Sequence, residues 1–166
     1  MLRPSGRRAR LTVMPRISSG LLLYRLVDGE IELLIAHMGG PFFEHRENHV
    51  WSIPKGMIEP GEADLLEVAE REFTEEMGSV PPPGETVELG STKSGRKTVV
   101  IFTREGDFDL TTFRSNEFEM EWPPGSGRIQ SFPEMDRADW VSPDEARLLL
   151  VKSQAVFVDR LIDVLA

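Results

Sequence analysis

The stretch GMIEPGEADLLEVAEREFTEEMG, residues 56–78, decides the fold that this chain of 166 residues is expected to adopt. Its second part places apolar residues at helical spacing, which predicts a helix over residues 64–77. Asp64 suits the N-cap position, because its carboxylate can accept hydrogen bonds from the free backbone N–H groups of the first turn. Gly78 follows where the left-handed residue that ends many helices belongs.

Three acids, Glu72, Glu75 and Glu76, lie on one side of this helix, beside its apolar sector. Each like-charge pair at this spacing costs about 0.2–0.5 kcal/mol, and the helix macrodipole disfavours acids in the last turns. A divalent cation removes this repulsion, so we predict a Mg²⁺ or Mn²⁺ site with oxygen ligands. A solvated acidic helix face is the alternative. Arg71 is expected to pair with Glu67 and Glu75 and so to orient a ligand.

The segment ahead of the helix, PKGMIEPGE over residues 54–62, is predicted to be a loop that contains two glycines. Gly56 and Gly61 permit tight turns and a close approach of the backbone. Lys55 can supply positive charge to a phosphate group, although an ordinary exposed lysine is the alternative. The sequence therefore places a candidate phosphate-binding side chain directly before the acidic helix.

Outward from this stretch, strand signals and helix signals are interleaved. Apolar runs bounded by turn residues predict strands, and Asp28-Gly29 predicts a hairpin turn. Ser142 and Pro143 open a further helix, since serine suits the N-cap and proline the first turn. The pattern predicts an α/β (α+β) fold, a mixed β-sheet sandwiched between helices. Strands are expected near residues 20–24, 31–37, 50–53, 86–90, 97–103, 118–122 and 138–141, a last helix near 154–165, and largely irregular structure over 104–131.

Residues 56–78 resemble the Nudix box, G-x5-E-x7-R-E-U-x-E-E-x-G-U, in which U is apolar. Two positions depart from it: eight residues rather than seven separate Glu62 from Arg71, and Ser79 occupies the final apolar position. The extra residue falls at the junction of loop and helix, which leaves the helical part in register and the role of Glu62 open. The likeness continues in WSIPKG at residues 51–56 and in Trp140-Val141. The resemblance implies a Nudix (MutT-like) hydrolase with the Nudix fold.

The resemblance also implies roles for the residues of the helix. Glu72, Glu75 and Glu76 correspond to metal ligands of the family, and one of them or a downstream glutamate acts as general base on water. Arg71 orients these glutamates, so the four residues together form the expected catalytic set.

Three positions outside the helix complete the site that the resemblance implies. Lys55 is expected to bind substrate. A backbone carbonyl near Gly56 is expected to complete the metal site. Glu134 is the downstream candidate for a metal ligand or general base, with an exposed loop acid as the alternative.

Members of the family hydrolyse a phosphoanhydride bond of a nucleoside diphosphate linked to another moiety, and we expect this metal-dependent reaction here. The Pro54-Lys55-Gly56 form looks most like the branch that acts on dinucleoside polyphosphates, and an NTP is a further candidate. That branch usually has a tyrosine after the box, whereas Tyr24, the one tyrosine of this chain, precedes it. Coenzyme A and ADP-ribose pyrophosphatases remain alternatives. Core packing or anchoring of a loop is the alternative for each candidate for base stacking, and these candidates are Phe42, Phe43, Trp51, Phe102, Trp122 and Phe132.

A non-catalytic Nudix module that binds nucleotide as a sensor is the alternative from another class of function. Such modules commonly lose box glutamates, so the presence of Glu72, Glu75 and Glu76 favours an enzyme. Turnover of nucleotide that depends on metal separates the two.

Composition limits the remaining possibilities. The chain has no cysteine, which excludes disulfides, thiolate metal sites and cysteine nucleophiles. The net charge is −9 although residues 1–10 hold four arginines and no acid, so the body should repel nucleic acid and anionic lipid. Residues 1–13 are expected to be a disordered basic tail, with a twin-arginine export signal as the weaker interpretation, before a single domain over 14–166. We expect a cytoplasmic protein, monomeric or homodimeric, with no membrane span and no stable binding of nucleic acid.

Overall fold

The computed structural model describes residues 16–166, so the expected tail over residues 1–13 and the domain boundary at residue 14 lie outside the described residues. The strands within this range are β1 (Arg16–Val27), β2 (Glu30–Met38), β3 (Trp51–Ser52), β4 (Lys55–Met57), β5 (Thr86–Ser94), β6 (Lys97–Glu105), β7 (Glu117–Glu121), β8 (Ile129–Pro133) and β9 (Met135–Val141). The helices are α1 (Leu65–Met77), α2 (Pro143–Leu149) and α3 (Ala155–Leu165), with 3₁₀ turns η1 (Leu110–Thr112) and η2 (Lys152–Gln154).

A mixed sheet of seven strands forms the centre of the molecule. Its main order is β3-β2-β1-β6-β5, while β4 pairs with β1 and β9 pairs with β2. β1 runs parallel to β6 and antiparallel to β2 and β4. The expected turn between β1 and β2 is present, with Asp28 and Gly29 both at positive φ, a conformation that these residue types favour in hairpins.

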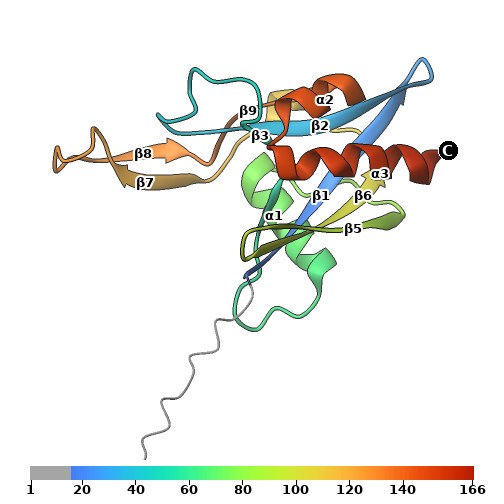
Figure 1. Ribbon diagram of the computed structural model, residues 1–166, viewed down its shortest axis with the longest axis horizontal. Coiled ribbons are helices and arrows are strands. Elements are labelled where there is room, and N and C mark those ends of the chain that lie inside the picture. Colours follow the sequence, from blue (N-terminus) through green and yellow to red (C-terminus); the bar gives the residue numbers. More distant parts are fainter. Residues whose placement is uncertain (1–15) are drawn as a thin grey trace, which may run out of the picture.

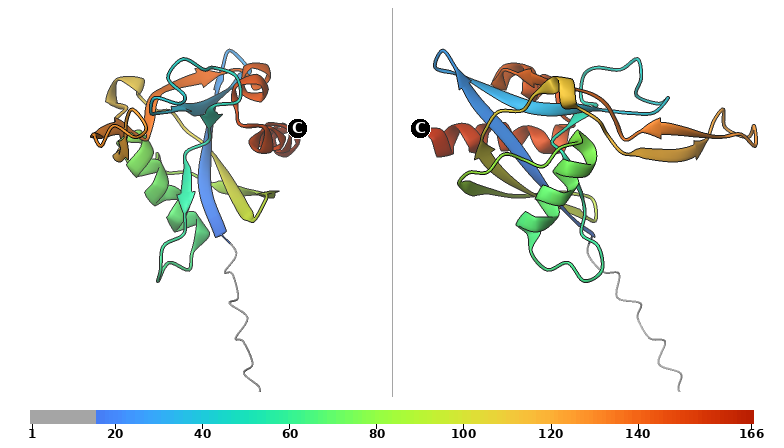
Figure 2. Two further views of the ribbon diagram at one scale, coloured as in Figure 1. Left: turned by 60° about the vertical axis from the view of Figure 1, so that its left-hand side comes forward. Right: turned by 180° about the vertical axis from the view of Figure 1, so that it is seen from behind.

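Both faces of this sheet are covered, which explains the continuous apolar run in β1. Leu21 and Leu23 lie on the face against which Phe73 of α1 packs. Leu22, which alternates with them, lies on the other face in a core with Phe157 of α3. α1 and the pair α2 and α3 accordingly lie on opposite sides of the sheet (Figure 2). The expected mixed sheet between helices is confirmed.

Two segments differ from the sequence-based expectation. Residues 55–57, expected in a loop, form β4 because their backbone pairs with residues 18–20 of β1. Residues 104–131, expected to be largely irregular, contain β7 and most of β8, which pair only with each other. The strand expected at 118–122 corresponds to β7, whereas β8 was missed because Ser, Gly and Pro dominate the sequence that leads into it.

The β7–β8 hairpin extends outward from the body of the domain (Figure 1). Backbone hydrogen bonds attach its base to the body at two places: the N–H of Asn116 donates to the carbonyl of Glu75 in α1, and the carbonyl of Glu134 accepts from the N–H of Gly39, which follows β2. The hairpin is therefore fixed where it meets the end of α1. None of the helices in residues 16–166 is long and apolar enough to cross a membrane.

Candidate active site

Helix α1 presents its acids at the border of its buried face. Asp64 caps the helix through hydrogen bonds from the backbone N–H groups of residues 66 and 67, and Gly78 ends it in the left-handed conformation, as expected. Glu76 is 9% exposed, the side chain of Glu72 is 12% exposed and that of Glu75 is 40% exposed. The packing of Phe73 and its apolar neighbours against the sheet thus carries two of the three acids into partly desolvated positions.

Arg71 binds the carboxylates of this region together. Its guanidinium holds Glu62 with two hydrogen bonds of 3.0 and 2.8 Å, and it also donates to Glu72 at 2.9 Å and to Glu75 at 3.2 Å. The pairing expected with Glu75 is present, but the pairing expected with Glu67 is wrong, because the side chain turns toward the loop before α1. The hydrogen bond with Glu62 is the main cause that raises the pKa of Arg71, and the bond from Arg71 lowers the pKa of Glu62.

The role of Glu62, left open by the extra residue in the box, follows from this geometry. Glu62 accepts the paired hydrogen bonds from Arg71 and a further one, of 2.8 Å, from the backbone N–H of Glu59. Helix α1 begins only at Leu65, so the extra residue lies in the irregular segment between Glu62 and the helix. The loop absorbs it without displacing the carboxylate from Arg71.

Glu76 is the most deeply placed of the three acids. Its carboxylate accepts a hydrogen bond of 3.2 Å from the backbone N–H of Lys55, and among residues 16–166 it forms no ion pair. Burial, followed by the charge of Glu72, raises the pKa of Glu76 to about 8. Burial also raises the pKa of Glu72, while Arg71 opposes that change. A negative charge on Glu76 is therefore poorly compensated by the protein itself.

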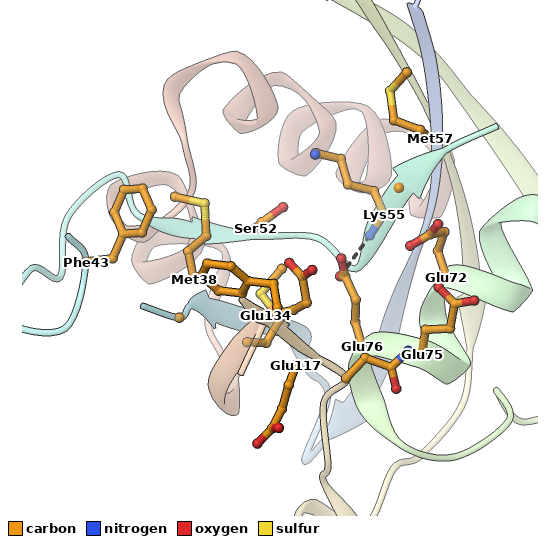
Figure 3. Close-up of a pocket in the computed structure, with 15 residues that line it drawn as sticks. Met38, Phe43, Ser52, Lys55, Met57, Glu72, Glu75, Glu76, Glu117 and Glu134 are labelled. Atoms are coloured by element: carbon orange, nitrogen blue, oxygen red, sulfur yellow. Dashed lines mark hydrogen bonds between the residues drawn. The ribbon is translucent and has the colours of Figure 1, made fainter. Parts of the chain in front are cut away.

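Strand β4 brings the backbone of the preceding segment against these acids. Gly56 pairs with Ser19 of β1, and a Cβ atom at position 56 would overlap the carboxyl group of Glu72. A side chain at position 56 would therefore displace the Glu72 carboxylate from its place beside Arg71. Figure 3 shows the side chain of Lys55 directed away from Glu72 and Glu76, along the cavity.

Glu134 lies across the cavity from α1. Its backbone is fixed on both sides, since its N–H donates to Asn116 and its carbonyl accepts from the N–H of Gly39. Burial, followed by the negative charge of Glu75, raises the pKa of Glu134. The structure therefore brings this downstream acid to the acids of α1, although more than fifty residues separate them in sequence.

A cavity of about 510 Å³ collects these groups (Figure 3). Lys55, Gly56, Glu72, Glu75, Glu76 and Glu134 all line it, so every expected site residue except Arg71 does so. Arg71 contacts the site through the carboxylates of Glu72 and Glu75. Sequence reasoning missed Met38, Asn116 and Phe118, which lie in segments without a motif, and of the six aromatic candidates for stacking only Phe43 lines the cavity.

The donor set fits a hard divalent cation. All side-chain donors are carboxylate oxygens, and Glu76 is a buried acid without a cationic partner among the described residues, an arrangement that a bound cation stabilises. In residues 16–166 no three acidic or histidine side chains are already gathered around one point. Arg71 holds Glu72 and Glu75 on one side, while Glu76 faces the backbone of Lys55.

Comparison with known proteins connects this arrangement to one family. The NUDIX domain family matches residues 15–161, which is most of the chain. No curated protein matches the sequence.

Solved structures with a similar fold are distant in sequence. The Ap4A hydrolase of C. elegans in a binary complex is 20% identical, with 90% of this chain and 97% of that chain covered and a TM-score of 0.58. The NUDIX domain of Shewanella oneidensis NrtR complexed with ADP ribose is 15% identical, covering 90% and 88% with a TM-score of 0.61. The MutT protein from Methanosarcina mazei is 22% identical, covering 89% and 93% with a TM-score of 0.55. These likenesses concern the fold, and they agree with the fold expected from residues 56–78.

Proposed function

The chain belongs to the NUDIX domain family, and we propose that it cleaves a phosphoanhydride bond of a nucleoside diphosphate linked to another moiety, in a reaction that depends on a divalent cation. The observation that carries this proposal is the cavity in which Glu72, Glu75 and Glu76 face Glu134, with Lys55 beside them. A divalent cation supplies the positive charge that this group of acids lacks, and it can bind the phosphate oxygens of a ligand at the same time.

Mg²⁺ or Mn²⁺ would be held by Glu72, Glu75 and Glu76, with the backbone of Gly56 as a further oxygen donor. When bound, the cation neutralises phosphate oxygens and favours the ionised form of water. Glu76 supports this assignment most directly, because it is buried and its charge has no side-chain partner among the described residues.

The remaining residues position these groups and move a proton. Arg71, fixed by Glu62, holds the carboxylates of Glu72 and Glu75 in place, which limits the rearrangement needed when a ligand binds. The ammonium group of Lys55 binds a substrate phosphate. Glu134, with its raised pKa, or one of the α1 glutamates accepts a proton from the attacking water.

The substrate is proposed to be a dinucleoside polyphosphate or an NTP. The Pro54-Lys55-Gly56 segment supports this choice by its likeness to the branch that acts on dinucleoside polyphosphates, and one structure with a similar fold is an Ap4A hydrolase. A chain with net charge −9 suits a small nucleotide bound with its cation better than a nucleic acid. We expect it to act in the cytoplasm as a monomer or homodimer.

A panel of dinucleoside polyphosphates, NTPs, ADP-ribose and coenzyme A, read by phosphate release and product mass, tests this function. We expect turnover with Mg²⁺ or Mn²⁺ and none in excess chelator, and Ca²⁺ should support binding better than catalysis because its coordination is longer and looser. Robust hydrolysis in chelator would overturn the proposal. Nucleotide binding without turnover across the panel would favour the sensor module instead.

A further inference from the structure

The cavity has a second end that differs chemically from the acidic one. Met38, Phe43 and Phe118 line it, and they come from the end of β2, the loop after β2, and β7. Figure 3 shows Met38 and Phe43 on the side of the cavity away from Glu72 and Glu75. One ligand that fills the cavity therefore meets carboxylates at one end and apolar, largely aromatic side chains at the other.

Phe118 is not part of either hydrophobic core of the domain. Its ring contacts Gly40, where an added Cβ would lie 2.9 Å from the ring, and it packs obliquely on Phe132 with centroids 6.0 Å apart. Within β7, Phe118 is half-buried while its neighbours Glu117 and Glu119 are exposed. An aromatic ring that lies outside the core yet lines a cavity is placed to contact a ligand.

The two segments that carry these rings also touch each other. Phe42, in the loop after β2, meets Trp122 at the end of β7 edge-to-face, with centroids 5.2 Å apart. Phe43, the next residue, is half-buried and packs partly against the core beneath β2, so its ring is anchored. Gly40 in the same loop receives the ring of Phe118. The aromatic end is thus formed before any ligand binds, which limits the entropy lost on binding.

We propose that Phe43 and Phe118 form a stacking subsite for the nucleobase of the substrate. This proposal rests on the function proposed above. Phosphate groups belong at the end with Lys55, because its ammonium group and a cation held by the glutamates would supply positive charge there. The planar, weakly polar base then reaches the end with Phe43 and Phe118, where ring contacts replace water. The cavity of about 510 Å³ lies within the range that encloses a small-molecule ligand of this kind.

Equilibrium binding in the presence of Ca²⁺ tests this subsite without turnover. The probes are ADP, which carries a base, and inorganic pyrophosphate, which does not, and calorimetry gives both dissociation constants. We expect Phe118→Ala to raise the Kd for ADP at least about tenfold, as base stacking on an aromatic ring commonly does, and to leave the Kd for pyrophosphate within about twofold. Phe43→Leu, which retains an apolar side chain for the core, should act in the same direction.

Ile129→Ala is the matched control, because Ile129 is an apolar residue of the same hairpin that is 65% exposed and does not line the cavity. It should leave both dissociation constants within about twofold of the wild type. The subsite is overturned if wild-type protein does not bind ADP, if Phe118→Ala changes the Kd of neither probe or of both equally, or if Ile129→Ala weakens ADP binding as strongly as Phe118→Ala.

The same measurements keep the two proposals separate. ADP binding that depends on Phe118, in a protein that hydrolyses no member of the substrate panel, overturns the hydrolase and supports the subsite. If the protein hydrolyses a substrate with metal but Phe118→Ala leaves the Kd for ADP unchanged, the subsite is overturned and the hydrolase is supported.

Discussion

The two ends of the cavity are built in different ways. The acidic end stands on α1, whose Phe73 is buried in the core against β1, and the guanidinium of Arg71 ties Glu62, Glu72 and Glu75 together. The aromatic end, with Phe43 and Phe118, is formed by the loop after β2 and by the β7–β8 hairpin. The two strands of this hairpin pair only with each other, and a backbone hydrogen bond attaches its base to α1.

This difference suits the acidic end to the chemical step and the aromatic end to recognition of the substrate. Groups that must hold a cation and a water molecule need fixed positions, and core packing supplies them. Groups that recognise the variable part of a substrate can lie on projecting segments, which change between proteins without disturbing the core. Substitutions at the acidic end should therefore act on turnover, whereas substitutions at the aromatic end should act on binding.

The largest effect is expected for Glu76→Gln at the acidic end. If Glu76 holds the cation, turnover should fall at least about a hundredfold, or about 2.7 kcal/mol of barrier, while the stability of metal-free protein stays the same or rises. Steady-state kinetics and thermal unfolding with and without Mg²⁺ measure both effects, and the stabilisation by Mg²⁺ should shrink. Glu67→Gln, an exposed acid of the same helix, is the control. Normal turnover of Glu76→Gln would remove this residue from the site.

A smaller effect is expected where the two ends meet, at Glu134. If its carboxylate accepts the proton of the attacking water, Glu134→Gln should lower kcat at least about tenfold, or about 1.4 kcal/mol, with little change in KM. Glu119→Gln, an exposed acid of the hairpin that does not line the cavity, is the matched control. An unchanged kcat would assign the proton transfer to a glutamate of α1.

The pH dependence of stability sharpens the description of the acidic end. Glu76 has a folded pKa of about 8, above the ordinary value of 4.5, so it stabilises the metal-free fold while protonated. That stability is fully present below the unfolded pKa and is lost as the pH rises through the folded pKa. Urea unfolding in chelator should show a loss of at least about 1 kcal/mol from this group between about pH 5 and about pH 8.5. The loss should disappear in Glu76→Gln, and equal pH profiles in the two proteins would contradict the assignment.

The smallest effect is expected from the N-terminal residues, which lie outside the described part of the chain. Deletion of residues 1–13 should leave turnover within about threefold, or about 0.65 kcal/mol, because the segment precedes β1 and carries no core pattern. Comparing kcat/KM of the full chain and the shortened chain measures this. A much larger loss would show that Arg7, Arg8 or Arg10 contacts the substrate.

The sequence by itself determined the parts of this protein that depend on neighbours along the chain. The limits of α1 follow from Asp64, Gly78 and the helical period between them, and the same period places Glu72, Glu75 and Glu76 on one side. Apolar runs and turn residues likewise predicted the hairpin at Asp28-Gly29 and the strands other than β4 and β8.

Only the tertiary structure decided which distant residues meet. Arg71 binds Glu62 rather than Glu67 because the loop before α1 returns to the helix, and Lys55–Met57 is a strand because β1 lies beside it. Phe118 and Glu134 reach the cavity through hydrogen bonds and packing at the base of the hairpin, for which no local pattern exists. Spacing along a helix fixes contacts within one turn, whereas contacts between segments depend on how the whole chain closes around its core.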